Sequence, residues 1–175
     1  MSDLKPAASR APRNPIPCLQ FQPGGLTHPD VLALLRTHLL AATEHSPADS
    51  IHALDSGGLQ APDTQFWSVW SQQTLVGMCA LKSLDAQHAE IKSMRTVDHW
   101  RRCGVGDAMM QHLLITAAAA GCQRLSLETG TAPAYAAAHR LYARHGFVPC
   151  PPFAAYQPDP HSCYMTRRLP AADDA

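Results

Sequence analysis

The residues best suited to chemistry lie between positions 90 and 107, where a predicted strand runs through a basic loop into a predicted helix. The loop holds Arg101 and Arg102 beside Gly104 and Gly106. Glycines allow a backbone to approach a ligand closely, and the N–H groups at a helix N-terminus attract anions. The two arginines add positive charge for the same anion. This combination predicts a phosphate or pyrophosphate site, and the alternative is a tight strand-to-helix turn that binds nothing.

Two common phosphate-binding patterns are absent from the sequence. There is no G-x-x-x-x-G-K-[ST], which excludes a P-loop. The G-x-G at residues 104–106 is not completed to the G-x-G-x-x-G of a dinucleotide-binding unit. What remains is R-x-x-G-x-G at residues 101–106, followed by L-Y-A-R-H-G-F at residues 141–147.

These two motifs resemble the R/Q-x-x-G-x-G/A and L-Y-x-x-x-G-F signatures of the GNAT superfamily of N-acetyltransferases, in that family's order and separation. The segments E-I-K-S-M-R, S-L-E-T-G and F-V-P-C-x-P-F are similar to a bacterial subgroup of small acetyltransferases. The resemblance covers roughly residues 65–169, and it implies transfer of an acetyl group from acetyl-CoA to a primary amine by direct attack in a ternary complex. It implies no metal. The alternative is a non-catalytic acyl-CoA-binding sensor or subunit.

The resemblance also implies how acetyl-CoA is held. The pyrophosphate is expected on the 101–107 loop, and the pantetheine arm beside the strand backbone at residues 94–97. Many family members carry an asparagine seven residues before the motif tyrosine, where this chain has Tyr135, so Thr131 or backbone groups are expected to replace that contact. The predicted acetyl-CoA residues are Met94, Arg95, Thr96, Val97, Arg101, Arg102, Cys103, Gly104, Val105, Gly106, Asp107, Thr131 and Tyr135.

The apolar pattern of residues 89–97 gives an independent sign of irregular strand geometry. Ile91 and Val97 share one face of a regular strand, whereas Met94 falls on the other. A β-bulge would explain this pattern and would leave backbone groups free for a ligand, and a strand buried on both faces would explain it equally well. By resemblance, a backbone N–H near Met94 and Arg95 would stabilise the oxyanion.

Two side chains are the predicted catalytic groups. Acyl transfer from a thioester expels a thiolate, which Tyr142 could protonate; otherwise Tyr142 is a packing residue. Glu90 lies eleven residues before Arg101, the offset of the catalytic glutamate in the founding histone acetyltransferases, and is the predicted general base. A surface ion pair is the other interpretation of Glu90, and Glu128 or a water chain is the alternative base.

The N-terminal half of the domain usually forms the acceptor pocket in this superfamily. Trp67, Trp70, His52 and Asp55 are therefore candidate pocket residues, with core or loop packing as the alternative. The acceptor itself stays open among small amines, amino acids, polyamines and protein N-termini.

Composition is consistent with these expectations. The chain has 175 residues, 46% of them hydrophobic, and its 14 basic residues balance its 14 acidic ones. This balance disfavours a nucleic-acid or membrane-surface partner, and no apolar run approaches a membrane span. The first 15 residues lack the apolar segment of a secretory signal, so we expect a cytoplasmic protein with reduced cysteines, and a homodimer is allowed.

The elements that must position these residues form one α/β (α+β) domain at residues 16–170, with flexible tails at 1–15 and 171–175. Apolar periodicity and turn residues predict a mixed, mostly antiparallel sheet flanked by helices. Helices are expected from about residue 27 to 42, over 105–120 and over 133–145. Strands are expected at 17–21, 66–70, 75–84, 89–97, 125–129, 147–148 and 164–169.

Overall fold

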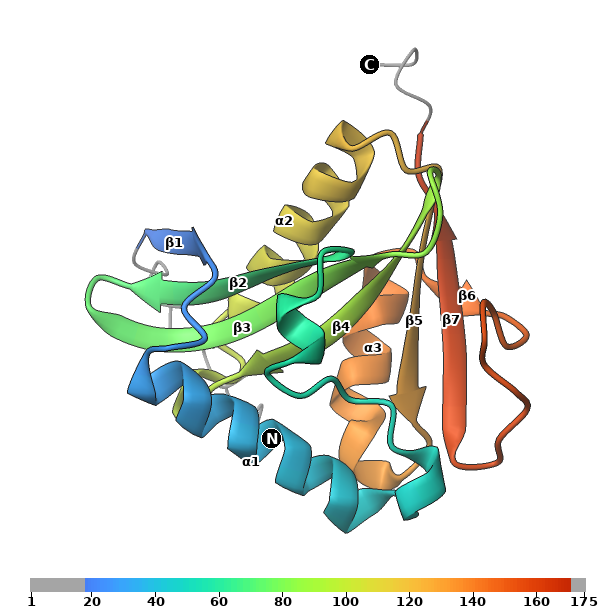
Figure 1. The fold of residues 1–175 in the computed structure, drawn as a ribbon, viewed down its shortest axis with the longest axis horizontal. Coiled ribbons are helices and arrows are strands. Elements are labelled where there is room, and N and C mark those ends of the chain that lie inside the picture. The colour runs from blue at the N-terminus through green and yellow to red at the C-terminus, as the bar shows by residue number, and fades with distance from the viewer. Residues whose placement is uncertain (1–17, 171–175) are drawn as a thin grey trace, which may run out of the picture.

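The computed structural model describes residues 18–170, and the two predicted tails lie outside the described residues. Seven strands form one sheet in the order β1-β2-β3-β4-β5-β7-β6 (Figure 1). The strands are β1 (Leu19–Pro23), β2 (Thr64–Ser71), β3 (Thr74–Ser83), β4 (His88–Thr96), β5 (Arg124–Gly130), β6 (Val148–Pro149) and β7 (Ser162–Arg168). The helices are α1 (Pro29–His45), α2 (Val105–Ala119) and α3 (Ala136–Arg144). None of these helices is long and apolar enough to cross a bilayer.

The predicted architecture is confirmed, with small shifts at the ends of elements. Neighbouring strands are antiparallel except for the parallel pair β4–β5. The first helix begins at Pro29 rather than Thr27, because the His28 ring accepts a hydrogen bond from the Asp30 N–H at 3.2 Å and caps the helix. The third helix begins at Ala136, after a 3-10 turn at Pro133–Tyr135.

The core consists of two apolar layers, one on each face of the sheet. On one face α1 packs Val31, Leu34 and Leu35 against β2 and β3. The other face is covered by α2 and α3, whose buried residues include Met109 and Tyr142 (Figure 1). Alternate residues of each strand therefore point toward α1 or toward the pair α2 and α3.

The strands β4 and β5 pair over only part of their length. Their register runs from His88 opposite Arg124 to Ile91 opposite Leu127, and pairing ends there. Figure 1 shows the two strands separating beyond this point, toward α3. The rest of β4 and the last residues of β5 therefore line an opening in the sheet.

A β-bulge interrupts β4 at this opening. Met78 of β3 lies opposite Arg95 and Ala80 lies opposite Lys92, so that Ser93 and Met94 both face Cys79. Ser93 has a φ of 47°, in the left-handed region. The predicted bulge is confirmed, and a regular strand buried on both faces is the wrong alternative.

Candidate active site

The opening between β4 and β5 brings together most of the residues predicted from the sequence. Met94, Arg95 and Thr96 lie on the part of β4 that has no β5 partner. The loop before α2 follows directly, and Tyr142 of α3 lies in the same apolar layer as the start of α2. On the opposite face of β4, Glu90 lies among polar groups.

The start of α2 has free backbone donors. Gly104 caps the helix with φ 87° and ψ −1°, a left-handed conformation that glycine adopts without strain. The Ala108 N–H donates to the Gly104 carbonyl at 3.0 Å. The N–H groups of Val105, Gly106 and Asp107 precede this bond, and the positive end of the helix dipole lies behind them. This geometry suits a phosphate or pyrophosphate.

Gly106 has a packing role besides the close approach to a ligand that its motif suggests. Its φ is not positive, unlike that of Gly104, so its backbone conformation does not itself require glycine. A Cβ built at Gly106 would lie 3.1 Å from Leu141 Cδ2. A glycine at this position therefore lets the first turn of α2 approach α3.

Three arginines surround the start of the loop. Arg101 pairs with Asp98 at 2.6 Å, and Arg95 lies 3.5 Å from the same carboxylate. Arg102 is exposed and has a φ of 62°. The Arg95 Nε is fully enclosed and has no hydrogen-bond partner among the described residues. Because Arg95 and Arg101 share the Asp98 carboxylate and Arg102 has no ion pair among the described residues, the loop keeps a surplus of positive charge.

Some predicted acetyl-CoA residues have partners within the protein. The Asp107 carboxylate accepts hydrogen bonds from Arg144 at 2.9 Å and His145 at 3.0 Å. Burial acts to raise the pKa of Asp107, but these two partners hold it below its usual value. The Cys103 N–H donates to the Trp100 carbonyl at 3.4 Å. The Asp107 side chain thus joins α2 to the end of α3, and only its backbone N–H faces the predicted anion site.

The far end of the predicted pantetheine path is also partly occupied. The Val97 N–H donates to the Val76 carbonyl at 2.9 Å, so it is already used within the sheet. The Thr131 hydroxyl donates to the Pro160 carbonyl at 3.2 Å. The Tyr135 ring lies against the Cα of Gly130, in the space that a Cβ would need. Contacts from these residues to acetyl-CoA stay predictions.

Tyr142 is a buried member of the apolar layer on the α2 and α3 face of the sheet. Burial, with a smaller contribution from the Glu128 charge, raises its pKa to about 12, so the phenol is protonated at neutral pH. Within residues 18–170 its hydroxyl has no hydrogen-bond partner, yet it is not among the fully enclosed polar atoms. A protonated phenol whose O–H has no partner within the protein can act as a general acid.

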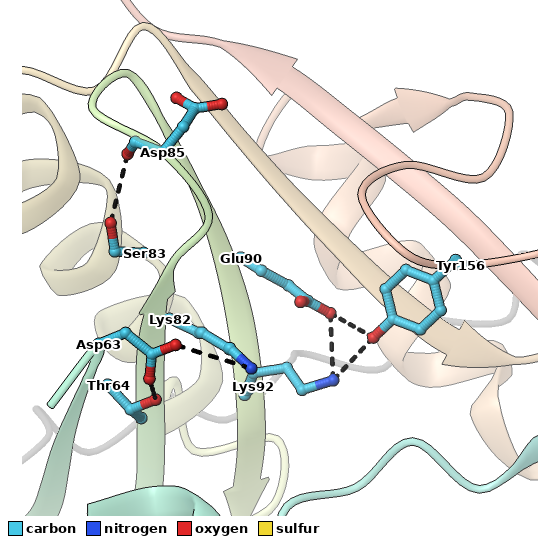
Figure 2. Close-up of polar contacts among 8 residues, drawn as sticks. All are labelled: Asp63, Thr64, Lys82, Ser83, Asp85, Glu90, Lys92 and Tyr156. Atoms are coloured by element: carbon cyan, nitrogen blue, oxygen red, sulfur yellow. Dashed lines mark hydrogen bonds and ion pairs between the residues drawn. The ribbon is translucent and has the colours of Figure 1, made fainter. Parts of the chain in front are cut away.

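Glu90 is part of a buried polar cluster formed by Glu90, Lys92 and Tyr156 (Figure 2). One carboxylate oxygen of Glu90, Oε1, accepts from Tyr156 Oη at 2.6 Å and from Lys92 Nζ at 3.1 Å. Lys92 Nζ also donates to Tyr156 Oη at 2.8 Å. The exposed fractions of the Glu90 and Lys92 side chains are 4% and 9%. The surface ion pair considered for Glu90 is therefore wrong, because its partner is a buried lysine.

Glu128 lies on β5 beyond the last β4–β5 pair. Burial raises its pKa, and the hydrogen bond from Ser162 Oγ at 2.7 Å offsets this only in part. Its charge raises the pKa of both Tyr142 and Tyr156. Glu128 is therefore within electrostatic reach of the phenol on one side and of the buried cluster on the other.

A cavity of about 530 Å³ opens beside the buried cluster. Glu90, Lys92 and His52 contribute to its wall, as does the segment 154–160 before β7. The edge of the His52 ring packs against the ring of Tyr156, with centroids 4.9 Å apart. His52 therefore lines a cavity, and its role as an acceptor-pocket residue stays a prediction.

The other three candidate pocket residues have structural roles. Trp67 packs in the layer below α2, with its ring against His112. Trp70 packs in the α1 layer, and its indole N–H donates to Ser68 Oγ at 3.0 Å. Asp55 caps a turn by accepting the Gly58 N–H at 2.8 Å. For these residues the contacts support the packing interpretation.

The sequence reasoning missed Lys92 and Tyr156. Lys92 could have been found, because residues two apart on a strand share a face and Glu90 was already singled out. Tyr156 lies in a proline-rich segment without periodicity, and its contact with Glu90 spans 66 residues. No local pattern indicates such a contact.

A sheet split between two strands, a bulge at the split and a helix N-terminus beside it define an acyl-CoA-dependent transferase. The chain belongs to the acetyltransferase (GNAT) family, whose model matches residues 31–147. It is 46% identical over 144 residues to the uncharacterized N-acetyltransferase YedL of Escherichia coli K12, an alignment that covers 82% of this chain and 91% of that protein. These matches establish the chain as an acetyltransferase.

Solved structures agree on the fold. A Klebsiella pneumoniae protein described as an acyl-CoA N-acyltransferase is 26% identical, with a TM-score of 0.69 over 86% of this chain and 97% of that one. A GNAT-family acetyltransferase from Elizabethkingia anophelis with acetyl-CoA bound is 17% identical, with a TM-score of 0.62 over 86% of this chain and 98% of that one. At 17% identity, the similarity to the Elizabethkingia protein shows a shared fold and does not by itself show a shared function.

Proposed function

We propose that the protein transfers the acetyl group of acetyl-CoA to a primary amine by direct attack in a ternary complex. The observation that carries this proposal is the arrangement at the split sheet. The helix N-terminus at Gly104, the strand backbone that has no β5 partner and the protonated Tyr142 phenol occur in sequence along one opening. A similar fold binds acetyl-CoA in the Elizabethkingia protein, which supports the same co-substrate for this chain.

Acetyl-CoA would lie along this opening. Its pyrophosphate would accept hydrogen bonds from the N–H groups of residues 105–107, with Arg101 and Arg102 supplying charge. The pantetheine arm would follow the unpaired edge of β4 at residues 94–96. The bulge at Ser93 and Met94 would direct a backbone N–H toward the carbonyl oxygen as it becomes an oxyanion.

The reaction removes two protons from the acceptor nitrogen and supplies one to sulfur. The acceptor ammonium first loses a proton, the neutral nitrogen then forms a bond to the acetyl carbon, and the carbon–sulfur bond breaks to release a thiolate. Tyr142 donates its phenolic proton to that sulfur, and the second proton lost from the nitrogen restores the phenol. An alkylamine with a pKa near ~10.4 is only about one part in a thousand free base at neutral pH, so a base accelerates the first step.

The contacts favour Glu128 over Glu90 as that base. Glu90 Oε1 already accepts two hydrogen bonds, one of them from a cation. Glu128 accepts one hydrogen bond, from Ser162, and its burial raises its pKa toward the range useful at neutral pH. Glu128 therefore takes the proton, and Glu90 holds Lys92 in place.

The test is a binding and turnover experiment on the full chain. Calorimetry should detect acetyl-CoA binding, and a panel of primary amines should give thiol release coupled to N-acetylation. Binding of acetyl-CoA without transfer to any amine would favour the non-catalytic acyl-CoA-binding alternative. A cytoplasmic location and a homodimer stay predictions.

A further inference from the structure

The cavity beside the opening has a buried lysine in its wall. Lys92 Nζ carries three N–H donors, of which Tyr156 and Glu90 accept two. The third has no acceptor among the described residues, although the side chain borders a cavity of about 530 Å³. A buried ammonium is costly unless it is paired, and a buried ion pair contributes little net stability. A binding role would explain its presence.

Two lysines and three acidic residues line the cavity, and the acidic residue that contacts Lys92 is already paired. Glu90 is committed to Lys92 and Tyr156. Lys82, on β3 opposite Glu90, also borders the cavity, and its ion pair with Asp63 is long, at 3.8 Å (Figure 2). This part of the wall therefore holds the ammonium groups of Lys82 and Lys92 and the carboxylate of Glu90, which is already paired.

The remaining acidic groups of the cavity are placed differently. Asp49 is exposed. Asp159 accepts the His161 N–H at 2.8 Å, which fixes a turn. Within residues 18–170 the Lys92 ammonium has hydrogen bonds with Glu90 and Tyr156 and none with either aspartate.

His38 of α1 lies within electrostatic reach of Lys92 and Arg95 on this face of β4. Burial, with further contributions from the charges of Arg95 and Lys92, lowers its pKa to about 4. The bulge matters here, because it places Lys92 and Arg95 on the same face although they are three residues apart. His38 is therefore neutral at physiological pH and adds no charge of its own.

We infer that the acceptor is an amine that also carries a carboxylate, such as an amino acid, and that Lys92 binds this carboxylate with its third N–H. The acceptor nitrogen would then lie toward Glu128, which is close enough to Lys92 for their charges to interact. Lys82 adds attraction for the same group. This inference rests on the proposed transfer reaction and specifies its substrate class.

Matched acceptors test the inference on the unmodified protein. Each of a set of L-amino acids is compared with its carboxamide and its decarboxylated amine at saturating acetyl-CoA. We expect kcat/KM to be about 10-fold or more higher for the carboxylates, as a charge-assisted hydrogen bond implies. Equal or faster transfer to the amides and amines would overturn the inference and leave the transfer reaction standing. Transfer to none of the compounds would overturn the transfer reaction as well.

Variants locate the carboxylate. Lys92→Met should bring the carboxylate-to-carboxamide ratio of kcat/KM close to one, whereas Lys92→Arg, which keeps the charge, should retain much of it. Lys82→Met removes a half-exposed cation without unpairing Glu90, and should lower the ratio while the protein remains folded. Arg36→Met removes an exposed cation of α1 that does not line the cavity, and should leave the ratio unchanged. An unchanged ratio in both lysine-to-methionine variants would contradict the assignment.

Discussion

Gly106 and Leu141 are in direct apposition where the first turn of α2 meets α3, with 3.1 Å between an added Cβ and Leu141 Cδ2. The glycine of the anion-binding motif is thus also a packing residue. Mutagenesis can separate the packing role from the predicted pyrophosphate contact, because the packing role depends on the Leu141 side chain alone.

Gly106→Val should weaken acetyl-CoA binding at least 10-fold and also lower the melting temperature, because branched carbons would push against Leu141. The double variant Gly106→Val/Leu141→Ala relieves that clash and should recover stability. Calorimetry and thermal unfolding of both proteins provide the measurement. If the double variant also recovers full acetyl-CoA affinity, Gly106 is a packing residue only, and the close approach to pyrophosphate at this position is disproved.

Gly104→Ala tests the left-handed cap. An alanine at φ 87° costs on the order of 1–2 kcal/mol, and relaxation of the loop would move the N–H groups of residues 105–107. We expect both lower stability and a higher Kd for acetyl-CoA. Gly121→Ala is the matched control, because Gly121 has a φ of 81°, open space around its Cβ position and a place at the other end of α2. It should lose similar stability and keep the Kd, and a Kd raised equally in both would refute the loop assignment.

The parts of the structure that could be predicted from sequence depend on local patterns. The helices follow from apolar spacing and capping residues, and the bulge followed from the misplaced Met94 in an otherwise alternating strand. The sequence could not predict on which face of the sheet Trp67 and Trp70 of β2 lie. Their apolar surroundings indicate that they are buried, but not against which helices they pack. The Tyr156 contact depends on how a proline-rich segment crosses the sheet, which no residue near Glu90 specifies.

Tyr142→Phe removes the proposed proton donor and keeps the ring that packs near Phe147. The turnover rate should fall by roughly 10²-fold or more, with acetyl-CoA affinity preserved. Because the phenol pKa is raised to about 12, the parent rate should show no loss from phenol ionisation up to about pH 10. An unaltered kcat in the variant would make Tyr142 a packing residue.

The same phenol predicts a change in stability at alkaline pH. Its folded pKa of about 12 lies above the unfolded value of ~10, so its contribution to stability is fully present below pH ~10 and is lost as the pH rises toward 12. Tyr142→Phe has no such proton to lose. The difference in free energy of unfolding between parent and variant should therefore shift in favour of the variant above pH ~10, measured by urea unfolding at several pH values. A constant difference across this range would mean that the phenol is not held neutral by burial.

Glu128→Gln and Glu90→Gln distinguish the two candidate bases. The first should lose most activity near pH 7 and recover part of it by about pH 9, where free amine is more abundant, because only proton removal is lost. The second should mainly raise KM for the acceptor, since Lys92 loses its anionic partner. The reverse pattern would assign proton removal to Glu90, as the sequence first suggested.

Glu128 and Glu90 should also differ in how they affect stability. Burial raises the pKa of Glu128 in the folded state above its unfolded value of ~4.3. The contribution of Glu128 to the free energy of unfolding is therefore stabilising below pH ~4.3, and it is lost as the pH rises through the folded-state pKa. The ionised form is thus a cost at pH 7, and Glu128→Gln should raise the melting temperature there while it lowers activity. Glu90→Gln removes the partner of a buried ammonium and should lower the melting temperature. Thermal unfolding of both variants at pH 7 provides the comparison. A lower melting temperature for Glu128→Gln would show that this carboxylate stabilises the fold, and would contradict its assignment as a destabilising buried charge retained for proton transfer.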